Sequence, residues 1–256
     1  MPKFIPKEHQ KRFIEIFDRL CRSRQPWQVW SDFVTMSATA ISNSVNADQA
    51  ETRERRYQEI ISGYQPVERE LFPQLVTETV NSLEENPAQD YLGDLYMGLG
   101  LGNHWRGQYF TPFQLCRGMA DLSLQDAEEH INREGWISIL DPACGAGAIL
   151  IAAANTLRSK GINYQERALF VGQDIDPIVA MMCYIQLSLL GCPGYVAIGN
   201  SLTTPLTGHP LLPTSREGLD IWITPIFYTE KWLLRRTLAT GKDGLICSML
   251  PDACTK

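Results

Sequence analysis

The sequence lacks any apolar run of the roughly 18 to 20 residues that a membrane-spanning helix requires. Its first ten residues, MPKFIPKEHQ, also lack the continuous apolar stretch of a secretion signal. Hydrophobic residues make up 44% of the 256-residue chain, which is enough for a substantial core. We therefore expect a soluble, cytoplasmic protein with no membrane partner.

Histidine is scarce, and the cysteines do not form metal-binding pairs. The chain has 4 His and 7 Cys, and no two cysteines stand in a Cys-x-x-Cys arrangement. An odd number of scattered cysteines without a secretion signal is typical of reduced thiols that serve as packing residues. We expect neither a disulfide framework nor a zinc site, and predict no metal ligands.

A basic excess is also missing. The chain has 23 Lys and Arg against 29 Asp and Glu, a formal net charge of −6. Proteins that bind nucleic acid strongly on their own usually carry a positive excess, so the composition argues against such a binder. It leaves open a local basic face, or a partner that supplies one.

Residues 1–100 show the three- and four-residue apolar spacing of amphipathic helices and no strand-like alternation. Phe13, Phe17 and Leu20 are one example of such a face. We predict an N-terminal helical lobe over residues 1–100, most simply a packing or interaction module. Its basic cluster, Arg53, Arg55 and Arg56, is interpreted as a solvated helix face.

Residues 101–256 alternate between short apolar runs and helical patterns. We expect strands at 136–140, 168–173, 195–200, 219–224 and 244–250. Helices are expected between them, at 147–161, 176–191 and 229–241. Strands that alternate with helices favour an α/β fold with a mostly parallel sheet covered on both faces.

In such a sheet, ligands bind at the carboxyl ends of the strands. DPACGAG, residues 141–147, follows the first expected strand, and Gly145 and Gly147 allow a tight turn and a close ligand approach. Asp141 would repel a pyrophosphate but can accept a hydrogen bond from an ammonium group. The pattern favours a zwitterionic or cationic ligand over a dinucleotide, although a lone Gly-x-Gly is often a plain turn.

Polar residues also follow the next two strands. Asp174 ends the second strand, where a carboxylate usually binds ribose hydroxyls, and Asp176 is better explained as a helix cap. Asn200, after the third strand, can bind an adenine ring or simply form a turn. Upstream, GQYFTP (residues 107–112) places aromatics before Thr-Pro, either at a site or in a loop packed on the sheet edge.

The order GQYFTP, DPACGAG, GQDID, GNSL and then a fourth strand with its loop resembles amino-type DNA adenine methyltransferases. It is most similar to the modification subunits of type I restriction systems and to phage- and plasmid-borne methylases. The resemblance covers residues from about 90 to 250. It implies a Rossmann-like, seven-stranded methyltransferase sheet over residues 101–256, S-adenosylmethionine as cofactor and DNA as substrate.

Individual site residues also follow from the resemblance. It implies that Phe110, Thr111 and Pro112 line the methionine end of the cofactor. Asp141 would receive the amino group, and Ala143, Gly145 and Gly147 would give backbone clearance. Asp174, Ile175 and Asn200 would contact the ribose and the adenine.

The loop after the fourth strand departs from the family pattern. The family has Asn or Asp, then Pro-Pro and an aromatic, which hold a flipped-out adenine and its N6 amino group. Here the positions read Thr224, Pro225, Ile226 and Phe227, and the resemblance makes Thr224, Pro225 and Phe227 the catalytic residues. Losing one preorganised polar partner costs about 3 kcal/mol, which predicts a slow or inactive enzyme unless another group compensates.

The chain ends soon after the expected fifth strand, so we expect the C-terminal strands to be missing and a separate specificity subunit to read the DNA. The leading hypothesis is an S-adenosylmethionine-dependent adenine-N6 DNA methyltransferase of restriction-modification type with weakened activity. The alternatives are a non-catalytic protein of the same fold that binds the cofactor, and a methyltransferase that acts on protein or RNA.

Overall fold

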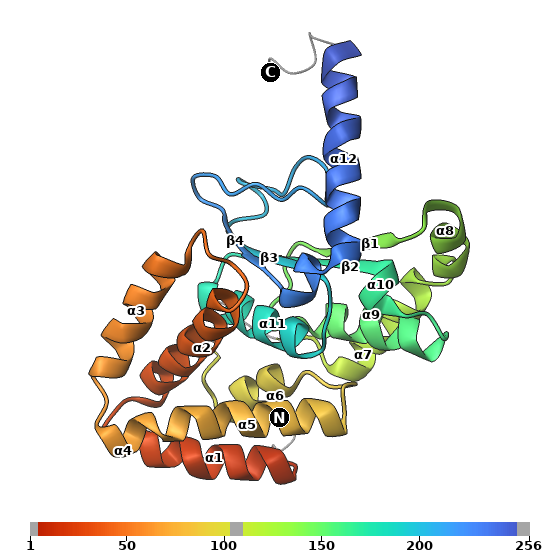
Figure 1. Cartoon of the computed structure of the whole chain (residues 1–256). Coiled ribbons are helices and arrows are strands. Elements are labelled where there is room, and N and C mark those ends of the chain that lie inside the picture. The colour runs from red at the N-terminus through yellow and green to blue at the C-terminus, as the bar shows by residue number, and fades with distance from the viewer. Residues whose placement is uncertain (1–4, 103–109, 250–256) are drawn as a thin grey trace.

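The computed structural model describes residues 5–102 and 110–249 (Figure 1). Its first part is helical, as predicted, and contains no strand within residues 5–102. The helices are α1 (Glu8–Leu20), α2 (Pro26–Asn43), α3 (Ala50–Ser62), α4 (Pro66–Arg69), α5 (Leu71–Glu85) and α6 (Tyr91–Gly98).

The second part has a mixed α/β architecture, which confirms the predicted class. Two helices, α7 (Phe113–Ser123) and α8 (Ala127–Glu134), precede the sheet. Its strands are β1 (Ile137–Asp141), β2 (Ala168–Asp174), β3 (Gly194–Ile198) and β4 (Asp220–Ile223). Between and after them lie α9 (Ala148–Ser159), α10 (Tyr164–Arg167), α11 (Pro177–Leu189), the 3₁₀ turn η2 (Pro225–Tyr228) and α12 (Glu230–Met249).

The strand order is β1-β2-β3-β4, with the first three strands parallel and β4 antiparallel to β3. In the antiparallel pair, Asp220 lies opposite Ile198 and Ile223 lies opposite Tyr195. A parallel neighbour would need a crossover that passes over one face, usually with a helix. The connection over residues 199–219 contains no helix, so β4 returns in the opposite direction.

The expected fifth strand at 244–250 is wrong: α12 continues through this segment to Met249. The error has a physical reason, because a short apolar run cannot be assigned to strand or helix from periodicity alone. No proline occurs between Pro225 and Pro251, so nothing obliges the helix to end at Gly241. The described residues thus contain four strands, not the five expected here or the seven of the full family sheet.

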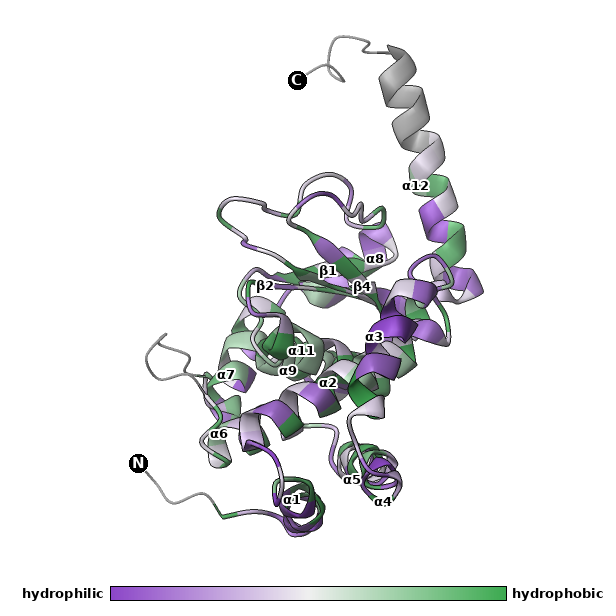
Figure 2. Ribbon diagram, turned by 90° about the vertical axis from the view of Figure 1, so that its left-hand side faces the viewer, coloured by the Kyte–Doolittle hydropathy of each residue, from purple (hydrophilic) through white to green (hydrophobic). Residues whose placement is uncertain are grey.

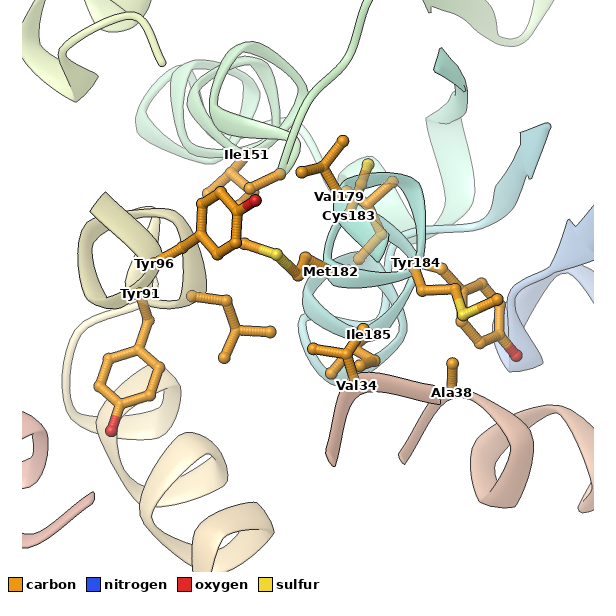
Figure 3. Packing of buried hydrophobic residues seen from close by; sticks show 14 of the residues in the cluster. Val34, Ala38, Tyr91, Tyr96, Ile151, Val179, Met182, Cys183, Tyr184 and Ile185 are labelled. Atoms are coloured by element: carbon orange, nitrogen blue, oxygen red, sulfur yellow. The ribbon is translucent and has the colours of Figure 1, made fainter. Parts of the chain in front are cut away.

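Two hydrophobic clusters cover the two faces of the sheet. On one face, α9 and α11 pack against Phe170 and Val196, and the same cluster continues into the N-terminal helices. Figure 3 shows α11 between Tyr91 and Tyr96 of α6 and Val34 and Ala38 of α2. The domain boundary near residue 100 stays a prediction, and a continuous core crosses it.

The opposite face is covered by η2, the start of α12 and part of the 199–219 connection. Phe227 and Trp232 pack there against Leu169 and Tyr195. Figures 1 and 2 show α12 rising from the sheet on the side away from α2 and α11. Over the described residues, no helix is both long and apolar enough to cross a membrane.

Candidate functional site

The carboxyl ends of β1 and β2 bring Asp141 and Asp174 to the same edge of the sheet, as predicted, because the two strands are parallel neighbours. Asp174 also holds the loop that follows β1. Its Oδ2 accepts from the Gly145 N–H at 2.9 Å, and its Oδ1 accepts from the Asp176 N–H at 2.9 Å. One carboxylate therefore joins the end of β2 to the glycine loop after β1.

Asp141 lies beneath that loop and is only 9% exposed. Its Oδ1 accepts a hydrogen bond from the Ala143 N–H at 3.1 Å. Burial raises the pKa of the Asp141 carboxyl, the Ala143 hydrogen bond opposes this, and the charge of Asp174 adds to it. Among the described residues neither aspartate has a salt-bridge partner, so the pair is suited to a ligand that brings a cation and hydroxyl groups.

The glycine loop needs its glycines. Gly145 and Gly147 have φ values of +52° and +97°, a region that side-chain-bearing residues rarely adopt. A Cβ on Gly147 would lie 2.8 Å from the Cys183 Sγ, and one on Gly145 would lie 3.4 Å from the Phe110 ring. The turn ends at Gly147, which is the N-cap residue of α9, and the helix begins at Ala148.

The GQYFTP segment meets the same loop. Phe110 stacks on Tyr96 with a ring-centroid separation of 5.6 Å and borders Gly145. Thr111 and Pro112 are exposed and lead directly into α7. Residues 107–109 of the motif lie outside the described residues. The structure therefore brings Phe110 to the glycine loop, in agreement with its predicted neighbourhood.

The remaining predicted cofactor residues also lie at this edge. Ile175, next to Asp174, is 65% exposed and presents an apolar surface to solvent. The Asn200 Oδ1 accepts from the N–H groups of Leu202 and Thr203 at 2.9 and 3.3 Å, so this residue forms a turn. Asp176 caps α11 as predicted.

Thr224 lies at the opposite edge of the sheet. Because β4 is antiparallel, its end is level with the start of β3, and the Thr224 N–H donates to the Gly194 carbonyl at 3.0 Å. The Thr224 hydroxyl donates to the Cys192 carbonyl at 2.7 Å and accepts from the Gly194 N–H at 2.9 Å. Its side chain is 0% exposed. In the predicted mostly parallel sheet, β4 is therefore the antiparallel strand, and it ends away from the carboxyl ends of β1, β2 and β3.

The residues after Thr224 are packed in the same way. Pro225 begins the 3₁₀ turn η2, and Phe227 is fully buried. The Phe227 ring lies 6.3 Å from that of Tyr195 and 5.9 Å from that of Trp232. The structure thus does not bring Thr224, Pro225 and Phe227 to the glycine loop, and their catalytic role stays a prediction.

Sequence reasoning missed a polar connection between the helical part and the glycine loop. The fully buried Gln186 donates from Nε2 to the Ala146 carbonyl at 2.9 Å and to the Asp90 Oδ1 at 2.8 Å. Its Oε1 accepts from the Leu92 N–H at 3.1 Å. The signal that could have revealed it is a lone glutamine in a helix, PIVAMMCYIQLSL, that is otherwise largely apolar.

The buried carboxyl group of Asp90 leads to a testable prediction of how the stability of the protein depends on pH. Burial raises its pKa from 3.8 to about 6, while the hydrogen bonds from Gln186 and Gly93 act in the opposite direction. A raised pKa means that the folded protein holds the proton more tightly, so this contribution to stability is complete below about pH 4 and lost by about pH 6. Asparagine cannot ionise, so Asp90→Asn should not show this loss of folding free energy, which is at most about 3 kcal/mol.

The check is the free energy of unfolding by urea at pH 4, 5, 6 and 7. The difference between Asp90→Asn and the parent protein should grow in favour of the variant up to pH 6 and then level off. An asparagine retains an oxygen that accepts from the Gly93 N–H, so the cap of α6 is kept. A difference that is the same at every pH would contradict the assigned titration.

Comparison with known proteins matches the chain to a family and to a curated relative. The family model described as N-6 DNA Methylase matches residues 88–244, which is more than half of the chain. A segment of 95 residues is 30% identical to the type I restriction enzyme MjaIX methylase subunit of Methanocaldococcus jannaschii. That segment is 37% of this chain but only 15% of the relative, so the similarity spans a small part of that protein.

Proposed function

Since the chain belongs to the N-6 DNA methylase family, we propose that it transfers a methyl group from S-adenosylmethionine to the N6 atom of adenine in DNA. The observation that best supports the cofactor is the arrangement of Asp141 and Asp174. Two carboxylates that have no salt-bridge partner among the described residues flank a glycine loop in which two residues have positive φ. S-adenosylmethionine carries both an ammonium group and a ribose diol, and it fits such an edge.

The proposed placement follows the residues along the edge. The methionine end would lie by Phe110, Thr111 and Pro112, with its amino group donating to Asp141. Ala143, Gly145 and Gly147 would provide the backbone clearance.

The nucleoside half would lie at the end of β2. Asp174 already accepts two backbone hydrogen bonds, and a carboxylate has about four acceptor sites, so its oxygens can still take the ribose hydroxyls. Ile175 would pack on the adenine ring. The Asn200 oxygen is engaged in its turn, which leaves the amide NH₂ group to face the ring.

The chemistry requires more than cofactor binding. S-adenosylmethionine supplies a methyl group on a positively charged sulfur. The adenine N6 lone pair is delocalised into the ring, and a protein acceptor for the N6–H is needed to make the amine nucleophilic. Our proposal assigns this work to Thr224 and the Pro225 carbonyl, with Phe227 stacking on a flipped base, and therefore requires β4 and η2 to leave their present positions.

A second function is favoured by those same positions. Thr224 makes buried hydrogen bonds to Cys192 and Gly194, and Phe227 is part of the core, so both residues act as structural groups in this arrangement. A protein that binds S-adenosylmethionine without transferring its methyl group is therefore the alternative. The methylase subunit of Methanocaldococcus jannaschii is by its name one subunit of an enzyme. We propose a separate specificity subunit as the partner that reads the DNA sequence.

One assay separates the two functions. The purified chain is incubated with methyl-labelled S-adenosylmethionine and unmethylated DNA, and the digested DNA is tested for N6-methyladenine. Cofactor affinity is measured in parallel by calorimetry. Labelled N6-methyladenine supports the methyltransferase, and binding without label in the DNA supports the alternative. No cofactor binding would reject both.

A further inference from the structure

A pocket of about 760 Å³ lies between the N-terminal helices and the sheet, next to the proposed cofactor edge. Residues of α2 and α3 form one wall, and the start of α11, the end of β3 and residues of β4 form the other. Ile198 lines the pocket and pairs in register with Asp174, so the two sites adjoin across one strand end. Nothing in the proposed cofactor placement uses this space.

The floor of the pocket carries a buried cation. Arg53 is 7% exposed, and its guanidinium lies 3.7 Å from the centre of the Trp222 ring. It donates to the Ile221 carbonyl at 3.1 Å and pairs with Asp220 at 3.5 Å. Burial lowers its pKa, and Asp220 opposes this. The interpretation of Arg53 as part of a solvated helix face is therefore wrong: this residue turns inward and joins α3 to β4.

Two further arginines stand at the rim. Arg55 and Arg56 line the pocket from α3 and are both exposed, which agrees with the solvated face predicted for them. Arg55 pairs only with the exposed Glu51, at 3.6 Å, and Arg56 has no salt bridge among the described residues. Figure 2 shows that much of α3 is hydrophilic.

The acidic residues of the pocket do not cancel this charge. Asp220 is already engaged, since its Oδ2 accepts from the Trp222 Nε1–H at 2.7 Å and its Oδ1 faces Arg53. Glu59 is the other acid in the lining. With three arginines against these two acids, the lining keeps a positive excess that can attract an anion.

One wall presents a buried hydroxyl with no partner. Thr35 on α2 is 1% exposed, lines the pocket, and its Oγ1 makes no hydrogen bond within the described structure. Buried polar atoms are nearly always paired, because an unpaired one costs stability. Because Thr35 lines the pocket, a ligand bound there would be able to supply the partner that this hydroxyl lacks.

From the pocket, its three arginines and the unpaired Thr35 hydroxyl, we propose a binding site for a nucleotide phosphate. Arg55 and Arg56 provide the exposed donors for the phosphate, and guanidinium groups match its geometry. Met181 and Ile198 provide apolar surface for the attached sugar or base. The phosphate belongs either to the DNA strand or to a free nucleotide, and only the first source rests on the proposed function.

The test compares two double variants that change the charge equally. Arg55→Gln/Arg56→Gln removes both rim donors. Arg12→Gln/Arg19→Gln is the matched control on α1, where Arg12 pairs with Glu8 in the same i,i+4 spacing as Arg55 with Glu51. Binding of labelled duplex DNA, adenosine 5′-monophosphate and inorganic phosphate is measured between 50 and 200 mM salt, without S-adenosylmethionine.

We expect the pocket variant to bind at least one nucleotide probe about 10-fold more weakly at low salt, with the control unchanged. If DNA is the source, the negative slope of the logarithm of the binding constant against the logarithm of the salt concentration should become shallower by about 1 for each lost phosphate contact. Weaker binding of adenosine monophosphate as well identifies a free nucleotide as a ligand. Equal losses in both variants, or no loss for either probe, would overturn the proposal.

A third variant tests the hydroxyl itself. Thr35→Val has nearly the same shape and removes only the unpaired oxygen, so its melting temperature should equal or exceed that of the parent. Its affinity for the nucleotide probe should fall about 3- to 10-fold if the hydroxyl contacts the ligand. A stabilised protein with unchanged affinity would show that Thr35 is merely an unpaired group. Since no methyl transfer is measured, these outcomes are independent of the catalytic assay.

Discussion

Asp141→Ala should weaken S-adenosylmethionine binding by roughly 100-fold, the loss typical when one partner of a buried charged hydrogen bond is removed. The carboxylate is nearly buried and makes only one hydrogen bond in the described structure, to the Ala143 N–H. It therefore has acceptor capacity left for an ammonium group. Isothermal calorimetry with the purified chain measures the change directly.

The loss should not come from unfolding. Burial and the nearby charge of Asp174 raise the pKa of Asp141, which means that holding this carboxylate ionised costs the folded protein free energy. The melting temperature of the variant without cofactor should therefore stay within a few degrees of the parent. Asp126→Ala is the matched control, because Asp126 is exposed and makes no capping hydrogen bond. Unchanged cofactor affinity in Asp141→Ala would place the ammonium group elsewhere.

Thr224→Asn should destabilise the protein by about 2 to 4 kcal/mol, and it should speed methyl transfer only if β4 and η2 leave the core, as the proposed reaction requires. From the sequence alone, asparagine at this position restores the family's carboxamide and is expected to speed the reaction. The structure adds a cost in stability to that expectation. A fully buried hydroxyl that bonds to Cys192 and Gly194 leaves no room for a longer amide.

Urea unfolding and the methylation assay together check this prediction. Thr229→Asn is the control, because Thr229 lies five residues further along in the same segment and is exposed, and its hydroxyl bonds only to the Ile226 carbonyl among the described residues. It should change neither stability nor activity by much. A faster Thr224→Asn enzyme with unchanged stability would show that the loop leaves the core and reaches the cofactor edge in the working protein.

The edge that carries the proposed cofactor site was predictable because its parts are local or follow from one parallel connection. Gly145 and Gly147 lie in the turn they form, and Asp176 caps the helix that it precedes. Asp141 and Asp174 end consecutive parallel strands, and right-handed crossovers place such ends side by side. The site residues on that edge could thus be placed from spacing and from a family resemblance.

The rest depends on contacts between segments far apart in the chain, which local patterns do not record. The direction of β4 depends on a connection that has no crossover helix, and it moves Thr224 to the other edge. A polar residue such as Arg53 or Gln186 looks the same in the sequence whether it faces water or bridges two elements. The glycine loop and its acids thus follow from local sequence, whereas the burial of polar groups and the elements they join depend on packing between distant segments.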